Sequence, residues 1–176
     1  REGEFDRYLA RPVNPLIQLL TRRFSLTVLG DLVGGIALIV VGASHVDVAW
    51  TAPALIYLVL ALVGAALVEA AMHLVASALA FRLTTTYALS GAIDQMLSTL
   101  GGYPLKIFPV SVQFGLTFVF PLAFIAYFPA TVLLGRTDEL LLPWLAVLAP
   151  LVGVLLFAAA YGYWRSQIRH YASTGH

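Results

Sequence analysis

Long apolar stretches separated by short charged segments dominate the sequence. The clearest stretch runs from Trp50 to Ala80 and contains a single formally charged residue, Glu69. About 20 apolar residues are enough to cross the hydrocarbon core of a bilayer as a helix, so this stretch is long enough with turns to spare. The pattern predicts an all-helical, polytopic bundle of transmembrane helices that carries amphipathic helices on its cytoplasmic side.

The same pattern divides the chain into four expected spans and the segments that join them. We expect spans at residues 25–42, 50–80, 109–134 and 140–163. The connections on one side are then residues 1–24, 81–108 and 164–176, and those on the other side are residues 43–49 and 135–139. Between Phe81 and Phe108, apolar residues recur at helical spacing beside Asp94 and Gln95, which favours an amphipathic helix in that segment.

Basic residues gather on one side of this arrangement. Nine of the ten Lys and Arg residues fall in residues 1–24, 81–108 and 164–176, and Lys106 is among them, whereas Arg136 alone falls on the other side. Cytoplasmic loops of membrane proteins carry an excess of Lys and Arg. We therefore expect residues 1–24, the middle segment and the C-terminus in the cytoplasm, and residues 43–49 and 135–139 outside the cell.

Composition agrees with a membrane protein and narrows its chemistry. The chain is 60% hydrophobic and 11% charged, with a mean hydropathy of +0.89, whereas globular domains carry about 25% charged residues. It contains no cysteine, which excludes a disulfide framework and a thiolate metal site. Membrane lipid is an expected partner and nucleic acid is not. Because the sequence opens on Arg1 rather than Met, we expect that helices precede it in a longer protein.

Three ionisable residues inside the expected spans are candidate site residues. Asp31 lies about one turn inside the first span, where it is either a solvated interfacial acid or a transport residue. Glu69 and His73 lie four residues apart and share a helix face, and an intramembrane ionisable residue is a functional candidate by default. They either pack the bundle as a pair or line a substrate path. Two such groups do not complete a zinc shell, so no metal site is expected.

Aromatic residues crowd the third expected span around two prolines. Phe124 and Tyr127 lie between Pro121 and Pro129, and prolines free carbonyls that neighbouring helices or water must satisfy in a membrane. A kinked aromatic helix of this kind suits a pathway for an apolar or cationic molecule, since aromatic faces attract cations. The alternative is core packing and an aromatic belt at the outer interface.

The sequence carries no recognisable catalytic motif. It lacks the G-x-x-x-x-G-K-[ST] phosphate loop, the G-x-S-x-G elbow and the H-E-x-x-H pair. We therefore expect no catalytic centre and no cofactor in this chain. If the protein uses ATP, another chain must bind it.

Two segments resemble the fifth membrane helix of six-span bacterial type-2 ABC (ABC-2) exporter permeases. They are Tyr103–Pro109, with the sequence YPLKIFP, and Leu116–Ala130, with the sequence LTFVFPLAFIAYFPA. Gly3–Pro12 is similar to the cytoplasmic loop that follows the second span of that family, and Tyr171–His176 is similar to its small, polar C-terminus. The resemblance implies that the four expected spans are the third to the sixth of six.

The resemblance also implies a mechanism and partners. Two permease subunits, identical or different, form the pathway as a dimer in the bacterial cytoplasmic (inner) membrane, and separate ABC ATPase subunits bind Mg-ATP. The segment at the front of this chain matches the main coupling loop, in which Phe5, Arg7, Leu9 and Arg11 are the expected ATPase contacts. An apolar path suits amphiphilic or hydrophobic cargo. The alternatives are a proton-coupled secondary transporter that uses Glu69 and His73, a membrane-embedded enzyme of lipid metabolism and a non-transporting assembly subunit.

Overall fold

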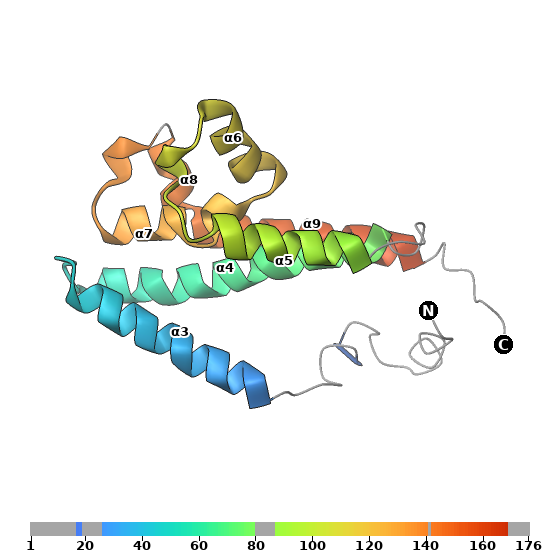
Figure 1. The fold of residues 1–176 in the computed structure, drawn as a ribbon, viewed down its shortest axis with the longest axis horizontal. Helices are drawn as coiled ribbons and strands as arrows, with labels where there is room; N and C mark the ends of the chain where they lie inside the picture. The colour runs from blue at the N-terminus through green and yellow to red at the C-terminus, as the bar shows by residue number, and fades with distance from the viewer. Residues whose placement is uncertain (1–16, 19–25, 80–86, 141, 169–176) are drawn as a thin grey trace. The chain divides into compact units, whose positions relative to one another are not determined.

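The computed structural model describes residues 17–18, 26–79, 87–140 and 142–168 (Figure 1). Every regular element in these ranges is a helix, and none is a strand, which confirms the all-helical prediction for the described residues. The chain divides into two compact units, Arg1–Asp47 with Ala172–His176, and Val48–Tyr171.

The first unit contributes one long apolar helix, α3 (Leu26–Ser44). It carries Asp31 in its second turn. At its C-terminus the Ser44 hydroxyl donates a hydrogen bond of 2.7 Å to the carbonyl of Val41, and His45 Nδ1 lies 2.8 Å from the same oxygen. These side chains satisfy a carbonyl that the end of the helix leaves without a backbone partner.

Helix α4 (Ala52–Leu79) is the longest element of the second unit. Its 28 residues span about 42 Å at 1.5 Å per residue, and the Thr51 hydroxyl accepts the amide hydrogen of Ala54 at its N-terminus. Among the described residues it is the one unbroken helix long and apolar enough to cross a membrane. Only 22% of its most apolar window is buried, whereas the core helix of a soluble protein is mostly buried.

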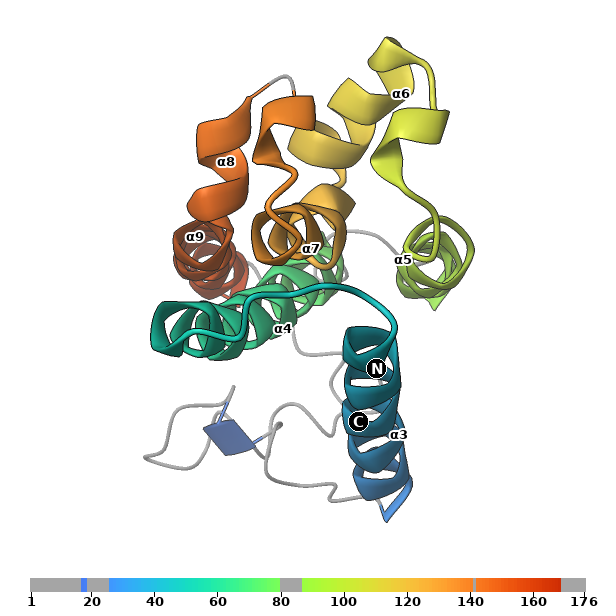
Figure 2. The same cartoon turned by 90° about the vertical axis from the view of Figure 1, so that its left-hand side faces the viewer.

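Helix α9 (Ala149–Ile168) packs along α4 and runs in the same direction (Figures 1 and 2). The contact is made by backbone. A Cβ built on Gly64 would lie 2.6 Å from Cα of Pro150, and one built on Gly153 would overlap the carbonyl of Gly64. Glycine at both positions therefore permits this close approach, which is the usual way in which helices pack in membranes.

The fourth expected span, 140–163, is broken near its start. Helix α8 (Pro143–Val147) ends before Leu148, and α9 continues from Ala149 to Ile168. Pro150 lacks the N–H that would bond to the carbonyl of Ala146. The Tyr57 hydroxyl of α4 donates a hydrogen bond of 2.6 Å to that carbonyl, so the break is stabilised by the neighbouring helix.

Helix α5 (Tyr87–Leu100) falls in the segment for which the sequence predicts an amphipathic helix. It lies along α4 in the opposite direction (Figure 1). His73 Nε2 of α4 lies 3.3 Å from Asp94 Oδ1 of α5, and Ile93 is buried. The helix ends where the amide of Gly101 bonds to the carbonyl of Leu97 at 3.0 Å.

A bent segment, which we call the hairpin (residues 105–139), follows α5. Its elements are the 3₁₀ turn η1 (Leu105–Ile107), α6 (Val110–Phe114), the π-helix η2 (Gly115–Val119), the 3₁₀ turn η3 (Leu122–Phe124), α7 (Tyr127–Leu133) and the 3₁₀ turn η4 (Thr137–Glu139). The helical pieces before and after Phe120 and Pro121 meet at 78°. Proline disfavours a helical conformation in the residue before it, and Phe120 is accordingly extended, with φ −116° and ψ 94°.

The two ends of the hairpin meet. Lys106 Nζ lies 2.8 Å from Glu139 Oε2, although the sequence predicts these residues on opposite sides of a membrane. A straight helix over 109–134 would separate its ends by about 39 Å. The sequence predicts a span over 109–134 that is kinked at its prolines, and in the structure the bend at Pro121 brings the ends of the segment together, so it is a bent pair of helices and not one straight crossing. The described residues thus contain α4 and this bent pair as membrane-span candidates, and four long spans are not confirmed.

The α4–α9 contact predicts that adding one methyl group at Gly153 lowers the stability of the folded protein. Gly153→Ala should destabilise the protein by about 1–3 kcal/mol, because the helices must separate to admit the new atom. Gly162→Ala is the matched control on the same helix, where a Cβ meets nothing within 4 Å, and it should be neutral or stabilising by up to about 1 kcal/mol. Unfolding in detergent, followed by tryptophan fluorescence, measures both. Equal stability of the two variants would contradict the contact.

The ion pair of the hairpin predicts a pH window. The hydrogen bond with Glu139 raises the pKa of Lys106 above 10.5, and Lys106 lowers the pKa of Glu139 below 4.5. The contribution of Glu139 is complete above pH 4.5 and is lost as the pH falls through its lower folded-state pKa. That of Lys106 is complete below pH 10.5 and is lost as the pH rises through its higher folded-state pKa.

Both side chains are partly exposed, so the effect on thermal stability should be small and should shrink at high salt. We expect the double variant Lys106→Gln, Glu139→Gln to melt slightly below the native protein between pH 5 and 10, and the difference to vanish at both extremes. The charge exchange Lys106→Glu, Glu139→Lys should recover the native melting temperature. A difference that does not change with pH or salt would argue against the pair.

Candidate functional site

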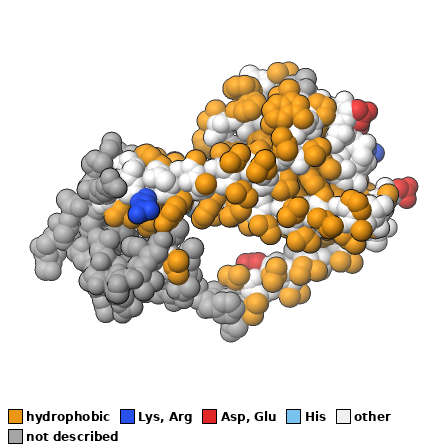
Figure 3. Space-filling model, turned by 180° about the vertical axis from the view of Figure 1, so that it is seen from behind, with side chains coloured by type: hydrophobic (Ala, Val, Ile, Leu, Met, Phe, Trp, Pro, Cys, Tyr) orange, Lys and Arg blue, Asp and Glu red, His pale blue; other side chains and the backbone are white. Residues whose placement is uncertain are grey.

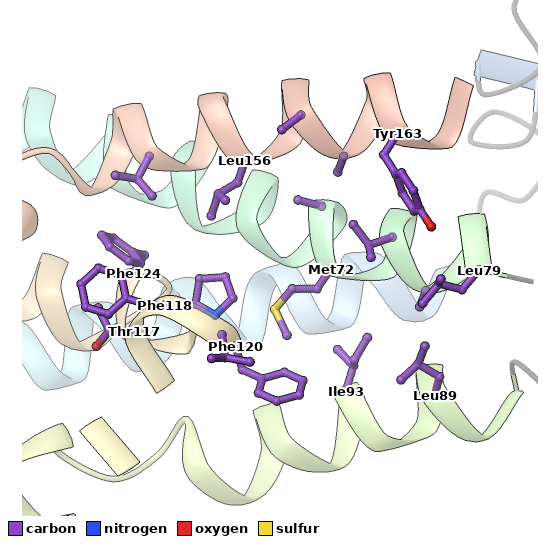
Figure 4. Close-up of a pocket in the computed structure, with 18 of the residues that line it drawn as sticks. Met72, Leu79, Leu89, Ile93, Thr117, Phe118, Phe120, Phe124, Leu156 and Tyr163 are labelled. Carbon is purple, nitrogen blue, oxygen red and sulfur yellow. The ribbon is translucent and has the colours of Figure 1, made fainter. Parts of the chain in front are cut away.

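The second unit forms an open apolar cavity of about 830 Å³, lined by α4, α5, α9 and the hairpin (Figure 4). It is not closed off from the surroundings, since Phe118 and Val119 in its lining are 52% and 65% exposed. Ligand sites in proteins commonly have volumes of about 300–1,000 Å³. The lining residues are Ala71, Met72, Val75, Ala76 and Leu79 of α4, Leu89 and Ile93 of α5, Thr117–Pro121 and Phe124 of the hairpin, Leu145, and Val152, Leu156, Ala159, Ala160 and Tyr163 of α9. Helices far apart in the sequence thus form one apolar chamber.

Small side chains on the two long helices create the space. Ala71 and Ala76 on α4 and Ala159 and Ala160 on α9 are all among the lining residues, and the backbones of the same two helices touch near Gly64. Beyond the glycine contact, toward the C-terminal ends of α4 and α9, α5 and the hairpin supply the other walls of the cavity. The cavity therefore exists only because α4 and α9 pack in parallel, and the sequence of either helix alone does not predict it.

The hairpin borders one end of the cavity with aromatic rings. Figure 4 shows Phe118, Phe120 and Phe124 together with Thr117 on this side. The π-helix η2 helps to aim them, because the amide of Phe120 bonds to the carbonyl of Gly115 five residues earlier, at 2.8 Å. Single π-turns of this kind are frequent at functional sites.

The other end of the cavity carries its one phenol. Tyr163 lies there beside Leu79 and Leu89, with its hydroxyl directed across the chamber (Figure 4). No hydrogen bond of this hydroxyl is recorded with any described residue. The other hydroxyl in the lining, that of Thr117, donates to the carbonyl of Gln113 at 2.7 Å. No charged side chain is among the lining residues.

A smaller cavity of about 410 Å³ lies within the hairpin and beside it. Its walls include Phe114, Phe118, Tyr127 and Phe128, and the Lys106–Glu139 pair also contributes to its lining. Rings pair within this group, since the centroids of Phe114 and Phe118 are 4.7 Å apart and those of Phe124 and Phe128 are 5.0 Å apart in an edge-to-face arrangement. The two cavities adjoin, since Thr117, Phe118 and Leu145 line both.

The structure divides the predicted pathway residues between different sites. Phe124 is 4% exposed and lines the large cavity, whereas Tyr127 lines the small one. His73 contacts Asp94 on α5, and no ion pair joins it to Glu69, although both residues are described. The Glu69 side chain is exposed, and neither Glu69 nor His73 lines the large cavity. The predicted pairing of Glu69 with His73 is therefore replaced by a contact between two helices.

The remaining predicted residues belong to the first unit. Asp31 is on α3, in the first unit. Phe5, Arg7, Leu9 and Arg11 lie outside the described residues. In the described ranges there is no group of three or more His, Asp or Glu side chains that could hold a metal ion.

Several cavity residues were not predicted from the sequence. Nothing in the sequence pattern distinguishes Met72, Ile93, Leu156 and Tyr163 from other apolar or interfacial residues. The available signal was the alanine content of both long helices, but only the contact between α4 and α9 shows which alanines line the cavity.

The outer surface of the described helices is apolar. Figure 3 shows hydrophobic side chains spread over them, with charged atoms at only a few points. Large exposed residues of the second unit include Leu55, Ile56, Val59, Leu60, Leu62 and Val63 on α4, and Leu151, Val154 and Leu155 on α9. A contiguous exposed apolar surface of this kind indicates contact with lipid or with other protein.

A comparison with protein families identifies one match, which covers nearly the whole chain. The family described as "ABC-2 family transporter protein" matches residues 1–175. Neither the search of curated proteins nor the search of solved structures gives a match. The match agrees with the resemblance carried by Tyr103–Pro109 and Leu116–Ala130.

The match extends over both units, including residues of the first that precede α3. It accounts for the apolar surface, because members of the family are integral membrane components of transporters, and they work with an ABC ATPase. We conclude that the chain belongs to the ABC-2 transporter family and is a membrane permease.

Proposed function

We propose that this chain is the membrane-spanning subunit of an ATP-driven exporter and that its cargo is amphiphilic or hydrophobic. Two permease subunits form the translocation pathway, and separate ATPase subunits bind Mg-ATP. The observation that carries the proposal is the family match over residues 1–175 together with an apolar cavity of about 830 Å³ that lacks charged lining residues. A sugar or an ion would need polar groups that this cavity does not offer.

The proposed topology follows from the direction of the helices. α4 and α9 run in the same direction, so the chain must return between them. α5 supplies the return, but its 14 residues span about 21 Å, less than the roughly 30 Å of bilayer hydrocarbon. Residues 101–108 complete the crossing, and the hairpin re-enters the membrane from the far side with its ends at the surface.

This topology keeps the basic residues unevenly distributed. In this topology Lys106 lies on the outer side with Arg136. Of the nine Lys and Arg residues first assigned to the cytoplasm, eight remain there. The positive-inside rule is still obeyed. The C-terminus is therefore proposed to be cytoplasmic, in a bacterial inner membrane.

Coupling to the ATPase is assigned to the front of the chain. Phe5 and Leu9 supply apolar anchors and Arg7 and Arg11 flank them, a combination common at protein–protein hot spots. ATP binding at the partner would then shift the permease dimer between two states, one open to each side of the membrane.

A proton-coupled transporter is the weaker alternative. It requires Glu69 and His73 to exchange protons along the pathway, but His73 contacts Asp94, and neither Glu69 nor His73 lines the cavity. The lipid-enzyme alternative needs a cluster of acids or histidines, and the described residues contain no such cluster of three.

The coupling assignment predicts the effect of replacing an apolar anchor. Phe5→Asp should weaken retention of the ATPase that copurifies with the native permease by more than about tenfold, because an apolar anchor is replaced by a charge. Val46→Asp is the control, since Val46 is exposed and belongs to the segment expected outside the cell. Pull-down and ATP hydrolysis measure both. Native retention by Phe5→Asp would refute the assignment.

The energy source can be tested at a second position. Glu69→Gln should leave ATP hydrolysis and ATP-dependent efflux by the complex close to native, because the side chain is exposed and lies outside the cavity. A proton-driven transporter would instead lose efflux in this variant at any ATP concentration. Efflux assays in vesicles with ATP present or absent distinguish the two.

A further inference from the structure

We propose that the large cavity of a single subunit binds one alkyl chain of an amphiphile, with its methyl end at the hairpin and its polar head at Tyr163. The inference rests on the proposed function only where it treats the amphiphile as cargo. The cavity itself and its lining are features of the second unit alone.

Shape and polarity both favour a long apolar ligand. The lining residues of α9 extend from Val152 to Tyr163 and those of α4 from Ala71 to Leu79, which correspond to about 16 Å and about 12 Å along the helices. An alkyl chain fills an elongated chamber without charged groups, whereas a compact polar molecule would leave its hydrogen-bonding groups unsatisfied there.

The two ends of the cavity differ in chemistry. At one end Phe118, Phe120 and Phe124 offer rings and no free polar group, because the Thr117 hydroxyl is already bonded to the carbonyl of Gln113. At the other end the Tyr163 hydroxyl extends into the chamber without a recorded partner among the described residues (Figure 4). A phenol both donates and accepts hydrogen bonds, so this end suits a hydroxyl, carboxylate or phosphate head.

The surroundings supply such a ligand. The chain is a membrane permease, so the acyl chains of lipids surround its membrane-facing surface. The cavity is open, with Phe118 and Phe120 in its lining 52% and 37% exposed, so an alkyl chain from the surrounding bilayer can enter it and bury this apolar lining. The same chemistry is offered by a membrane lipid and by a transported amphiphile.

Photolabelling tests the site and its polarity. The probe is a 12-carbon fatty acid with a diazirine at its terminal carbon, incubated with the full permease in lipid nanodiscs, and cross-links are mapped by mass spectrometry. We expect labelling to concentrate on Phe120, Phe124 and Met72. A probe with the diazirine next to the carboxyl group should label Tyr163 and Leu79 instead.

Adjacent leucines on α9 provide matched variants. Leu156→Trp fills the cavity and should reduce labelling of the hairpin rings several-fold, whereas Leu155→Trp, at a position 60% exposed, should leave it unchanged. Tyr163→Phe removes only the hydroxyl, so it preserves the fold, and it should weaken probe affinity several-fold without moving the terminal label. Tyr163→Phe decides the question if Leu156→Trp fails to give a native size-exclusion profile.

Labelling spread evenly over exposed positions, unaffected by Leu156→Trp and Tyr163→Phe, would overturn the inference. Adding the partner ATPase and Mg-ATP distinguishes the two sources of the chain. Loss of label during turnover identifies a transported amphiphile, and unchanged label identifies a resident lipid; both results support the alkyl-chain site. Absence of any ATPase partner would refute the proposed function and leave the labelling result intact.

Discussion

The close contact between α4 and α9 is the constraint on which the second unit depends. Gly64 and Gly153 let the two backbones touch, and the parallel direction of the helices obliges the chain between them to reverse its course. That reversal brings α5 against α4 and folds the hairpin back on itself. The cavity is the space that remains beyond the glycine contact, where alanines line both helices.

Sequence reasoning predicted the elements that local pattern determines. α4 begins and ends within two residues of the expected range 50–80, because a long apolar run whose one proline, Pro53, lies in the first helical turn has one plausible structure. The run over 109–134 is equally apolar, but its course depends on Pro121 and on the distant partner of Lys106. Hydropathy and charge counting treat such a segment as a span, and only the contact with Glu139 reveals that it turns back.

The candidate site could be predicted only in part for a related reason. Phe124 was identified because aromatic residues around a proline are visible in the sequence. Met72 and Tyr163 were not predicted. They line the cavity only because α4 packs along α9, and these two residues are some 90 positions apart in the sequence. Ionisable residues are the most visible candidates in an apolar sequence. The large cavity, however, is distinguished by having no charged residue in its lining. His73 and Asp94 instead join α4 to α5.

The central claim is that the chain reverses between α4 and α9, so that the two ends of the hairpin emerge on one side of the membrane. The chain contains no cysteine, so single cysteines can be placed at Lys106 and Glu139 without background. We predict that a membrane-impermeant maleimide, added outside intact cells, modifies both positions. Modification of one position from outside and of the other only after the membrane is opened would contradict this account.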